Sequence, residues 1–300
     1  MFRYAVATEY GASLVEYGIV LAVVAAVAFE AVSGLGEEVS SALDAGTLSL
    51  ASYTGNTPDF DPDAFVLEVH TEKFRVFPSS GGAIEIDWGS EEANALCGTS
   101  FVAGPSVSCE YPNFGRYFIS ITGDLQRYGY ATDENTNEDL VRVMQWGNTG
   151  LTSLRQAFRG ATSLQSVPSH LPPTVSTLTN AFRSAENFND KSVSSWDVSN
   201  VTGFGGMFAG ARAFNQPLDG WDTSMGTTFN YMFHGAFRFN QDISGWDTSS
   251  AVDMSQMFLN ASSFSGDLSG WCVSNILSPP PGFKTASAMT GEPVWGSCPL

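Results

Sequence analysis

The chain has 300 residues, of which 43% are hydrophobic, so it is long enough to bury a sizeable core and to divide into two or three domains. Its formal net charge is −18 at pH 7, from 31 acidic and 13 basic residues. This balance argues against a nucleic-acid partner, because binding phosphates requires clustered Lys and Arg. We therefore expect no nucleic acid among its partners.

A long apolar segment lies near the N-terminus. Residues 12–43 are rich in Ala, Val, Leu and Ile and contain no Lys, Arg or Pro. This composition favours a helix that is apolar on all sides and is buried in a bilayer or among other helices. Glu16 is unusual there, because a charge in an apolar environment is costly unless it is paired. A signal peptide fits the weakly basic flank poorly, and a simple membrane anchor leaves Glu16 unexplained.

The start of this segment has a short motif. Gly11 is followed five and six residues later by Glu16 and Tyr17, then by the apolar run and the sequence "GLGEEVSSAL". This pattern resembles the Flp-type pilins, the type IVb pilins of tight-adherence (Tad) pili. The resemblance implies that a prepilin peptidase removes the leader 1–11, which makes Ala12 the mature N-terminus. It also implies that Glu16 pairs with the Ala12 amine of a neighbouring subunit when the helices assemble into a filament.

The next segment, residues 44–64, is composed mainly of Ser, Thr, Gly, Pro and Asp and is predicted to be a linker. Asp59, Asp61 and Asp63 alternate in it, and such alternating carboxylates suit a calcium ion. The alternative is a solvated acidic turn broken by prolines, which we favour. We expect neither a bound metal nor a cofactor.

Residues 65–145 contain short runs of β-forming residues separated by turn residues, such as "AIEIDWG" and "YFISITG". They predict a small antiparallel β-sandwich. The pair "AIEIDWG" and "YPNFGRYFISITG" resembles PKD-type, immunoglobulin-like surface domains. Cys97 and Cys109 lie between these strands, and we expect them to be joined.

The four cysteines form two neighbouring pairs, Cys97 with Cys109 and Cys272 with Cys298. An even number of cysteines in such pairs suits two disulfides and an exported protein. The closeness of each pair in sequence favours these pairings over the other two possible connectivities.

Residues 146–300 repeat with a period of about 25 residues, and the repeat is marked by aromatic side chains. One repeat cannot bury these side chains alone, whereas stacked copies can. The predicted repeat core is therefore Phe182, Trp196, Phe208, Phe214, Trp221, Phe233, Phe239, Trp246, Phe258, Phe264 and Trp271.

The repeat unit "FNQDISGWDTSSAVDMSQMFLNASS" resembles the repeats of BspA-like leucine-rich-repeat surface proteins. The resemblance implies a solenoid in which "DISGWDT" is a strand and "MSQMFLNA" a short helical turn. The tail from Trp271 resembles the segment that closes such repeats, with Cys272 and Cys298 tying a polar cap. A ligand face, if the repeats have one, should use variable positions such as Asp219, Asp222, Asp242, Asp247 and Asp253.

The sequence contains no catalytic motif, and its histidines, His70, His170 and His234, stand in unrelated segments. We expect no catalytic centre. The expected fold class is multidomain: a leader (1–11), a long apolar helix (12–43), a linker (44–64), a β-sandwich (65–145) and a leucine-rich-repeat-like solenoid with a C-terminal cap (146–300).

The expected function is that of a structural subunit of a type IVb pilus. The prepilin would reside in the inner membrane and be cleaved by the prepilin peptidase. The pilus assembly machinery would then polymerise its helix with the helices of other copies. The repeats, displayed outside the cell, would adhere to host or surface glycans or proteins. The alternative is a membrane-anchored surface adhesin that does not polymerise, and the two differ in cleavage at Gly11.

Overall fold

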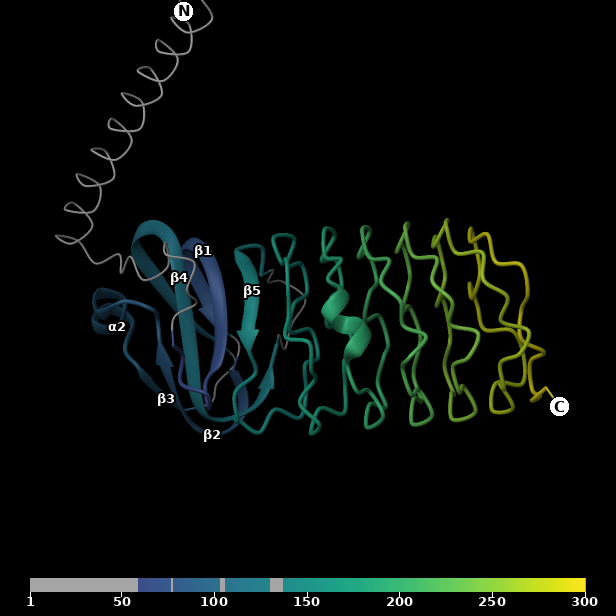
Figure 1. Ribbon diagram of the computed structural model, residues 1–300, viewed down its shortest axis with the longest axis horizontal. Helices are drawn as coiled ribbons and strands as arrows, with labels where there is room; N and C mark the ends of the chain where they lie inside the picture. The colour runs from purple at the N-terminus through teal and green to yellow at the C-terminus, as the bar shows by residue number, and fades with distance from the viewer. Residues whose placement is uncertain (1–58, 77, 103–105, 130–136, 300) are drawn as a thin grey trace, which may run out of the picture. The chain divides into compact units, whose positions relative to one another are not determined.

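The computed structural model describes residues 59–76, 78–102, 106–129 and 137–299 (Figure 1). Contacts within the chain place Asp59–Leu300 in one compact unit. The described elements are β1 (Phe65–Val76), β2 (Pro78–Asp87), α2 (Glu91–Cys97), β3 (Ser100–Val102), β4 (Val107–Tyr128), β5 (Leu140–Gln145) and the 3-10 helix η2 (Lys191–Ser195).

The five strands form one antiparallel sheet in the order β3-β2-β4-β1-β5. Successive side chains of a strand point to opposite faces, so the alternating apolar residues of each strand gather on one face. Phe65 and Leu67 of β1 lie beside Ile121 and Ile119 of β4, and all four are buried. We call this the inner face of the sheet.

The inner face is covered by α2 and by the first repeat. α2 packs against β4, and the Phe65 ring lies 4.8 Å from Tyr128 and 5.9 Å from Trp146. Tyr128 in turn lies 6.3 Å from Phe158 of the first repeat, measured between ring centroids. The predicted β-sandwich is therefore wrong. The described strands form a single open sheet, because the repeats take the place of a second sheet over its apolar face.

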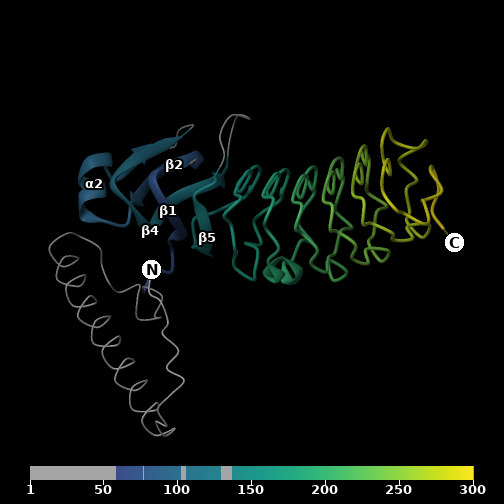
Figure 2. The ribbon, with the colours of Figure 1, turned by 90° about the horizontal axis from the view of Figure 1, so that it is seen from above.

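After β5 the chain forms successive repeats that lie side by side (Figures 1 and 2). Neighbouring repeats are joined by isolated parallel bridges, and the first of them starts from the end of β4. The bridged pairs are Arg127 with Ser153, Ser153 with Thr177, Thr177 with Gly203, Gly203 with Thr228, Thr228 with Asp253, and, at other points, Arg142 with Ser166 and Asp267 with Gly291. We refer to residues 146–299 as the repeat stack.

The segment "MSQMFLNA" does not form the predicted helical turn. Gln256 and Asn260 have φ values of 56° and 61°, in the left-handed region that a right-handed helix excludes. The Gln256 amide donates to the Pro281 carbonyl oxygen at 2.9 Å, and the Phe258 amide donates to that of Phe283 at 2.9 Å. These amides therefore pair with the next repeat, whereas helical amides pair four residues back in their own segment.

The segment "DISGWDT" does not form the predicted strand. The Asp242 carboxylate accepts a hydrogen bond from the Ser244 amide at 2.9 Å, and Asp247 accepts one from Ser249 at 2.9 Å. Such local bonds from Asp to the amide two residues later favour a turn over an extended chain. Beyond β5, the described residues contain no regular strand and only the short helix η2. The predicted leucine-rich-repeat-like solenoid, with a strand and a helical turn in each repeat, is therefore wrong.

Aromatic side chains fill the interior of the repeat stack. The Phe233 ring lies 5.9 Å from Phe208 and 5.6 Å from Phe258, and the Trp246 ring lies 6.1 Å from Trp221 and 6.2 Å from Trp271. Each of the eleven side chains predicted for the repeat core is at most 4% exposed. Aromatic pairs at these distances stabilise beyond the area that they bury.

The tryptophans also carry hydrogen bonds between repeats. The indole N–H of Trp221 donates to the Val193 carbonyl oxygen at 3.1 Å, and that of Trp246 donates to Leu218 at 2.9 Å. Each bond reaches back to the preceding repeat. A buried indole N–H without a partner costs free energy, so this bond fixes the position of each Trp.

Both disulfides join the cysteine pairs expected from sequence. Cys97, at the end of α2, is bonded to Cys109 of β4, and Cys272 is bonded to Cys298 near the C-terminal end. The first bond holds α2 against the sheet. The second ties the segment around Cys298 to the segment around Cys272, where the Val273 amide also donates to the Ser297 carbonyl oxygen at 2.8 Å.

We predict that Phe233→Ala lowers the free energy of unfolding by about 3–5 kcal/mol, because it removes a ring that contacts three repeats. Denaturant unfolding followed by tryptophan fluorescence measures this change. Phe237→Ala, which truncates a 42% exposed Phe in the same repeat, is the matched control and should cost far less. Equal effects of the two variants would contradict the assignment of Phe233 to the core.

Removing the second disulfide should loosen the C-terminal end of the stack. The double variant Cys272→Ser, Cys298→Ser should lose about 2–4 kcal/mol of stability, as is usual for a disulfide that closes a loop of this size. Hydrogen exchange should show the loss of protection concentrated in 266–299. The variant Cys97→Ser, Cys109→Ser is the control, and its losses should instead fall in α2 and β4. An identical exchange pattern in both variants would be evidence against this picture.

Candidate ligand-binding face of the sheet

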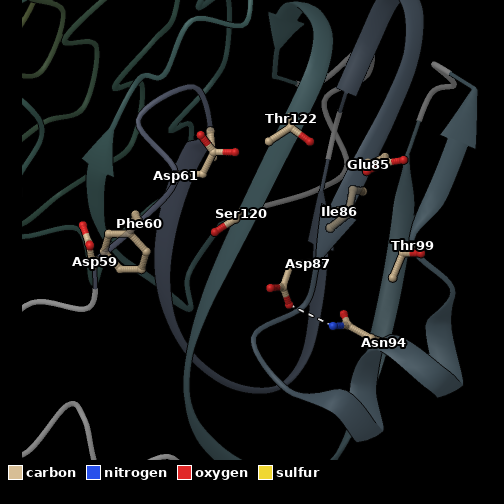
Figure 3. Close-up of a pocket in the computed structure, with 11 residues that line it drawn as sticks. Asp59, Phe60, Asp61, Glu85, Ile86, Asp87, Asn94, Thr99, Ser120 and Thr122 are labelled. Carbon is tan, nitrogen blue, oxygen red and sulfur yellow. Dashed lines mark hydrogen bonds between the residues drawn. The ribbon is translucent and has the colours of Figure 1, made fainter.

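A pocket opens on the face of the sheet opposite the inner face, which we call the outer face (Figure 3). Because Ile119 and Ile121 of β4 point inward, Ser120 and Thr122 point to the outer face. The register places Glu85 of β2 beside Thr122, and Asp87 beside Ser120. The pocket has a volume of about 410 Å³.

Four carboxylates line the pocket. Glu85 and Asp87 come from β2, while Asp59 and Asp61 come from the segment just before β1. None of the described residues that line the pocket is Lys, Arg or His, so they give it a negative potential. The side chains of Asn94, Thr99, Ser120 and Thr122 add hydrogen-bonding groups, and the ring of Phe60 adds an apolar wall.

The turn after β2 fixes Asp87 in the pocket. One Asp87 carboxylate oxygen accepts hydrogen bonds from the Gly89 amide and from the Asn94 side chain, both at 2.9 Å (Figure 3). The Asn94 side-chain oxygen accepts from the Trp88 amide at 2.7 Å. Gly89 has a φ of +86°, and a Cβ there would lie 2.7 Å from the Phe118 carbonyl oxygen, so this position requires glycine. The Asp87 carboxylate is therefore held in place before any ligand arrives.

α2 supports the same corner. The Ser90 hydroxyl accepts a hydrogen bond from the Ala93 amide at 3.1 Å and caps the helix, which places Asn94 on the first turn. The buried Trp88 donates its indole N–H to the Gly98 carbonyl oxygen at 2.8 Å and closes the end of the helix onto the turn. The short sequence "DWGSEEAN" thus builds one wall of the pocket.

A cluster of basic side chains lies next to the pocket on the outer face. The Phe60 ring is 5.3 Å from Phe118, and the Arg116 guanidinium lies 4.9 Å from the centre of the Phe118 ring. Arg116 Nε is 2.7 Å from Glu68 Oε1, and Arg142 Nη1 is 3.3 Å from Glu68 Oε2.

Glu68 holds this cluster together. Its side chain is only 3% exposed, and His70 Nε2 also lies 3.3 Å from Oε1. A buried carboxylate is tolerated when it is paired, and here two guanidinium groups pair with it. Together, Glu68, Arg116 and Arg142 carry one surplus positive charge.

The acidic residues that the sequence singled out do not form a metal site. Asp61 accepts a hydrogen bond from the Asp63 amide at 2.9 Å, which makes a local turn, and Asp63 does not line the pocket. Over the described residues, no group of three or more His, Cys, Asp and Glu side chains is arranged to hold a metal ion. His70, His170 and His234 are not brought together with each other.

The aspartates proposed for a ligand face of the repeats are mostly engaged in turns. Asp222, Asp242 and Asp247 each accept an amide two residues later, at 2.9–3.0 Å, and Asp253 does the same. Hydrogen bonds from the Ser224 side chain and amide lower the pKa of Asp222, and those from Ser244 lower the pKa of Asp242. These carboxylates are bound to the backbone of their own repeat.

Gly11, Ala12, Glu16 and Tyr17, the residues expected to act in processing and assembly, lie outside the described residues. Four pocket residues were not predicted from the sequence: Glu85, Asp87, Ser120 and Thr122. The alternation in "AIEIDWG" and "YFISITG" was the signal that places them on one face of the sheet. Nothing in the pattern indicated that Asp59 and Asp61 would meet them.

The chain matches the protein family described as "Mycoplasma protein of unknown function, DUF285", over residues 129–225 and 176–294. These two overlapping segments together cover more than half of the chain. The chain belongs to this family. The match begins just after β4, so it covers the repeats and leaves the pocket outside it. Comparisons with curated proteins and with solved structures yield no match.

These findings correct two resemblances. The repeats match the DUF285 family, and nothing supports the BspA-like assignment. The resemblance of the N-terminus to Flp-type pilins is not supported either, because the match to this family lies at 129–225 and 176–294. Among the residues that the structure describes, no helix has the length and apolar character needed to span a membrane. The expected transmembrane helix, at 12–43, lies outside them.

Proposed function

We propose that the protein acts outside the cytoplasm as a recognition protein that adheres to a partner through the pocket on its outer face. The single observation that carries this proposal is that the described residues lining the pocket include four carboxylates and no basic side chain. Such a pocket suits a cationic group, such as the amine of a lysine side chain presented by a partner protein. The carboxylates attract the charge, and the neighbouring hydroxyl and amide groups orient it.

The covalent structure supports a location outside the cytoplasm. All four cysteines are engaged in disulfides, and such bonds persist in oxidising compartments and are rare in the cytosol.

In this proposal the repeat stack supports the sheet and does not itself bind the partner. Its interior is filled by aromatic rings, and its carboxylates at Asp222, Asp242 and Asp247 are committed to turns. Assembly into a pilus depended on the overturned pilin resemblance and forms no part of this proposal.

The test is to titrate the full chain with two short peptides whose ends are blocked, one containing lysine and the other glutamine at the same position. We expect the lysine peptide to bind and the glutamine peptide not to bind in isothermal titration calorimetry. Glu85→Gln should lower the affinity for the lysine peptide by about tenfold, because it removes one carboxylate that pairs with the amine.

Glu72→Gln, which neutralises an exposed acid of β1 outside the pocket, is the matched control and should leave binding unchanged. Equal binding of both peptides, or no loss in Glu85→Gln, would show that the pocket does not recognise a cation.

A further inference from the structure

Arg116 is held in place with part of its guanidinium group still available. Its Nε lies against Glu68 and its guanidinium carbon Cζ lies over the Phe118 ring, while the side chain remains 37% exposed. The ion pair with Glu68 uses Nε, and neither it nor the contact with the Phe118 ring occupies the two terminal nitrogens. A guanidinium with a fixed Nε presents these nitrogens as a fork that matches the two oxygens of a carboxylate.

Arg142 differs from Arg116 in this respect. Its Nη1 lies against Glu68, and its Nη2 donates to the Gln165 side chain at 3.1 Å. Both of its terminal nitrogens are therefore engaged within the protein. Because the two arginines share one carboxylate, the cluster keeps a surplus positive charge, and among the described residues its least engaged donors are the terminal nitrogens of Arg116.

The distance between this fork and the acidic pocket follows from the strand. Arg116, Phe118, Ser120 and Thr122 alternate along β4 and lie on the outer face. A strand advances about 3.3 Å per residue, so Arg116 and Ser120 are about 13 Å apart. The paired rings of Phe60 and Phe118 lie between the positive and the negative site.

We propose that Arg116 is a carboxylate-binding residue and that the outer face binds an extended peptide segment of a partner protein that carries both charges. The amine of a lysine occupies the pocket, and the carboxylate of an acidic residue binds the Arg116 fork. In an extended peptide, residues four positions apart point to the same side and lie about 13 Å apart, which matches this spacing. The inference rests on the proposed function of the pocket.

The test uses blocked pentapeptides with lysine at one end and glutamate at the other, in both orders along the chain. Each is compared with a peptide in which glutamine replaces the glutamate and with one in which glutamine replaces the lysine. The full-length protein should bind the better of the two bipolar peptides about tenfold more tightly than the peptide with lysine alone, since a charged bidentate contact is added.

Arg116→Gln should remove this tenfold advantage and leave the affinity for the lysine-only peptide unchanged. Arg116→Lys keeps the positive charge beside Glu68, so its stability should equal that of the unaltered protein. Because it lacks the two terminal guanidinium nitrogens, it should still lose most of the tenfold preference for the bipolar peptide. Arg238→Gln, in the repeat stack, is the control and should bind all peptides as the unaltered protein does.

The outcomes separate the two proposals. If the lysine-only and bipolar peptides bind equally and Arg116→Gln changes neither, the role of Arg116 is wrong while the pocket stands. If no lysine peptide binds, the proposed function itself fails. An oligosaccharide of uronic acids that binds as tightly as the bipolar peptide, and with the same dependence on Arg116, would overturn the assignment of a peptide ligand.

Discussion

Backbone hydrogen bonds between neighbouring repeats are the interaction on which the rest of the structure depends. The turns of each repeat leave amides that cannot pair within the repeat, and a buried amide without a partner is costly. The Phe208 amide donates to the Met232 carbonyl oxygen, and the Phe233 amide donates to that of Met257, both at 2.9 Å. A single repeat therefore cannot satisfy its own backbone, and each repeat folds only against its neighbours.

The sheet supplies the first edge for this pairing. The Thr152 amide donates to the Gln126 carbonyl oxygen of β4 at 2.8 Å, and the Tyr128 amide donates to that of Ser153 at 3.3 Å. The inner face of the sheet is then buried against the repeats. Polar and charged side chains of the strands are left on the outer face, so the pocket and the Arg116 cluster both lie there. The same constraint that builds the stack thus decides which side of the sheet is available to a partner.

The sequence predicted burial better than it predicted local conformation. The spacing of Trp and Phe identified side chains that are buried, because a regular spacing of large aromatic residues leaves few alternatives to a common interior. It did not predict that Gln256 and Asn260 adopt left-handed φ values, since neither is glycine. Nor did it predict that Asp242 turns the chain, because an Asp–x–Ser spacing suits turns and exposed strand ends alike. Hydrogen bonds determine the left-handed φ values of Gln256 and Asn260 and the turn at Asp242.

The candidate site could be predicted only in part. Alternation along β2 and β4 assigns Glu85, Asp87, Ser120 and Thr122 to one face, but strand order and register decide that they meet. The contribution of Asp59 and Asp61 depends on how the segment before β1 folds back, which no sequence pattern encodes. The formation of a single sheet, where the sequence predicted a sandwich, also depends on contacts between segments that are distant in sequence. Whether a second sheet or the repeats cover the inner face is decided by contacts between distant segments such as Phe65 and Trp146.

The most direct test of this account is to detect the hydrogen bonds between repeats by NMR, through scalar couplings across each bond in a deuterated sample. The account predicts a coupling from the Phe258 amide to the Phe283 carbonyl, and from the Phe233 amide to the Met257 carbonyl. A helical turn in the same segment would instead couple the Phe258 amide to the Met254 carbonyl, four residues earlier. That result would contradict the claim that each repeat is completed by its neighbour.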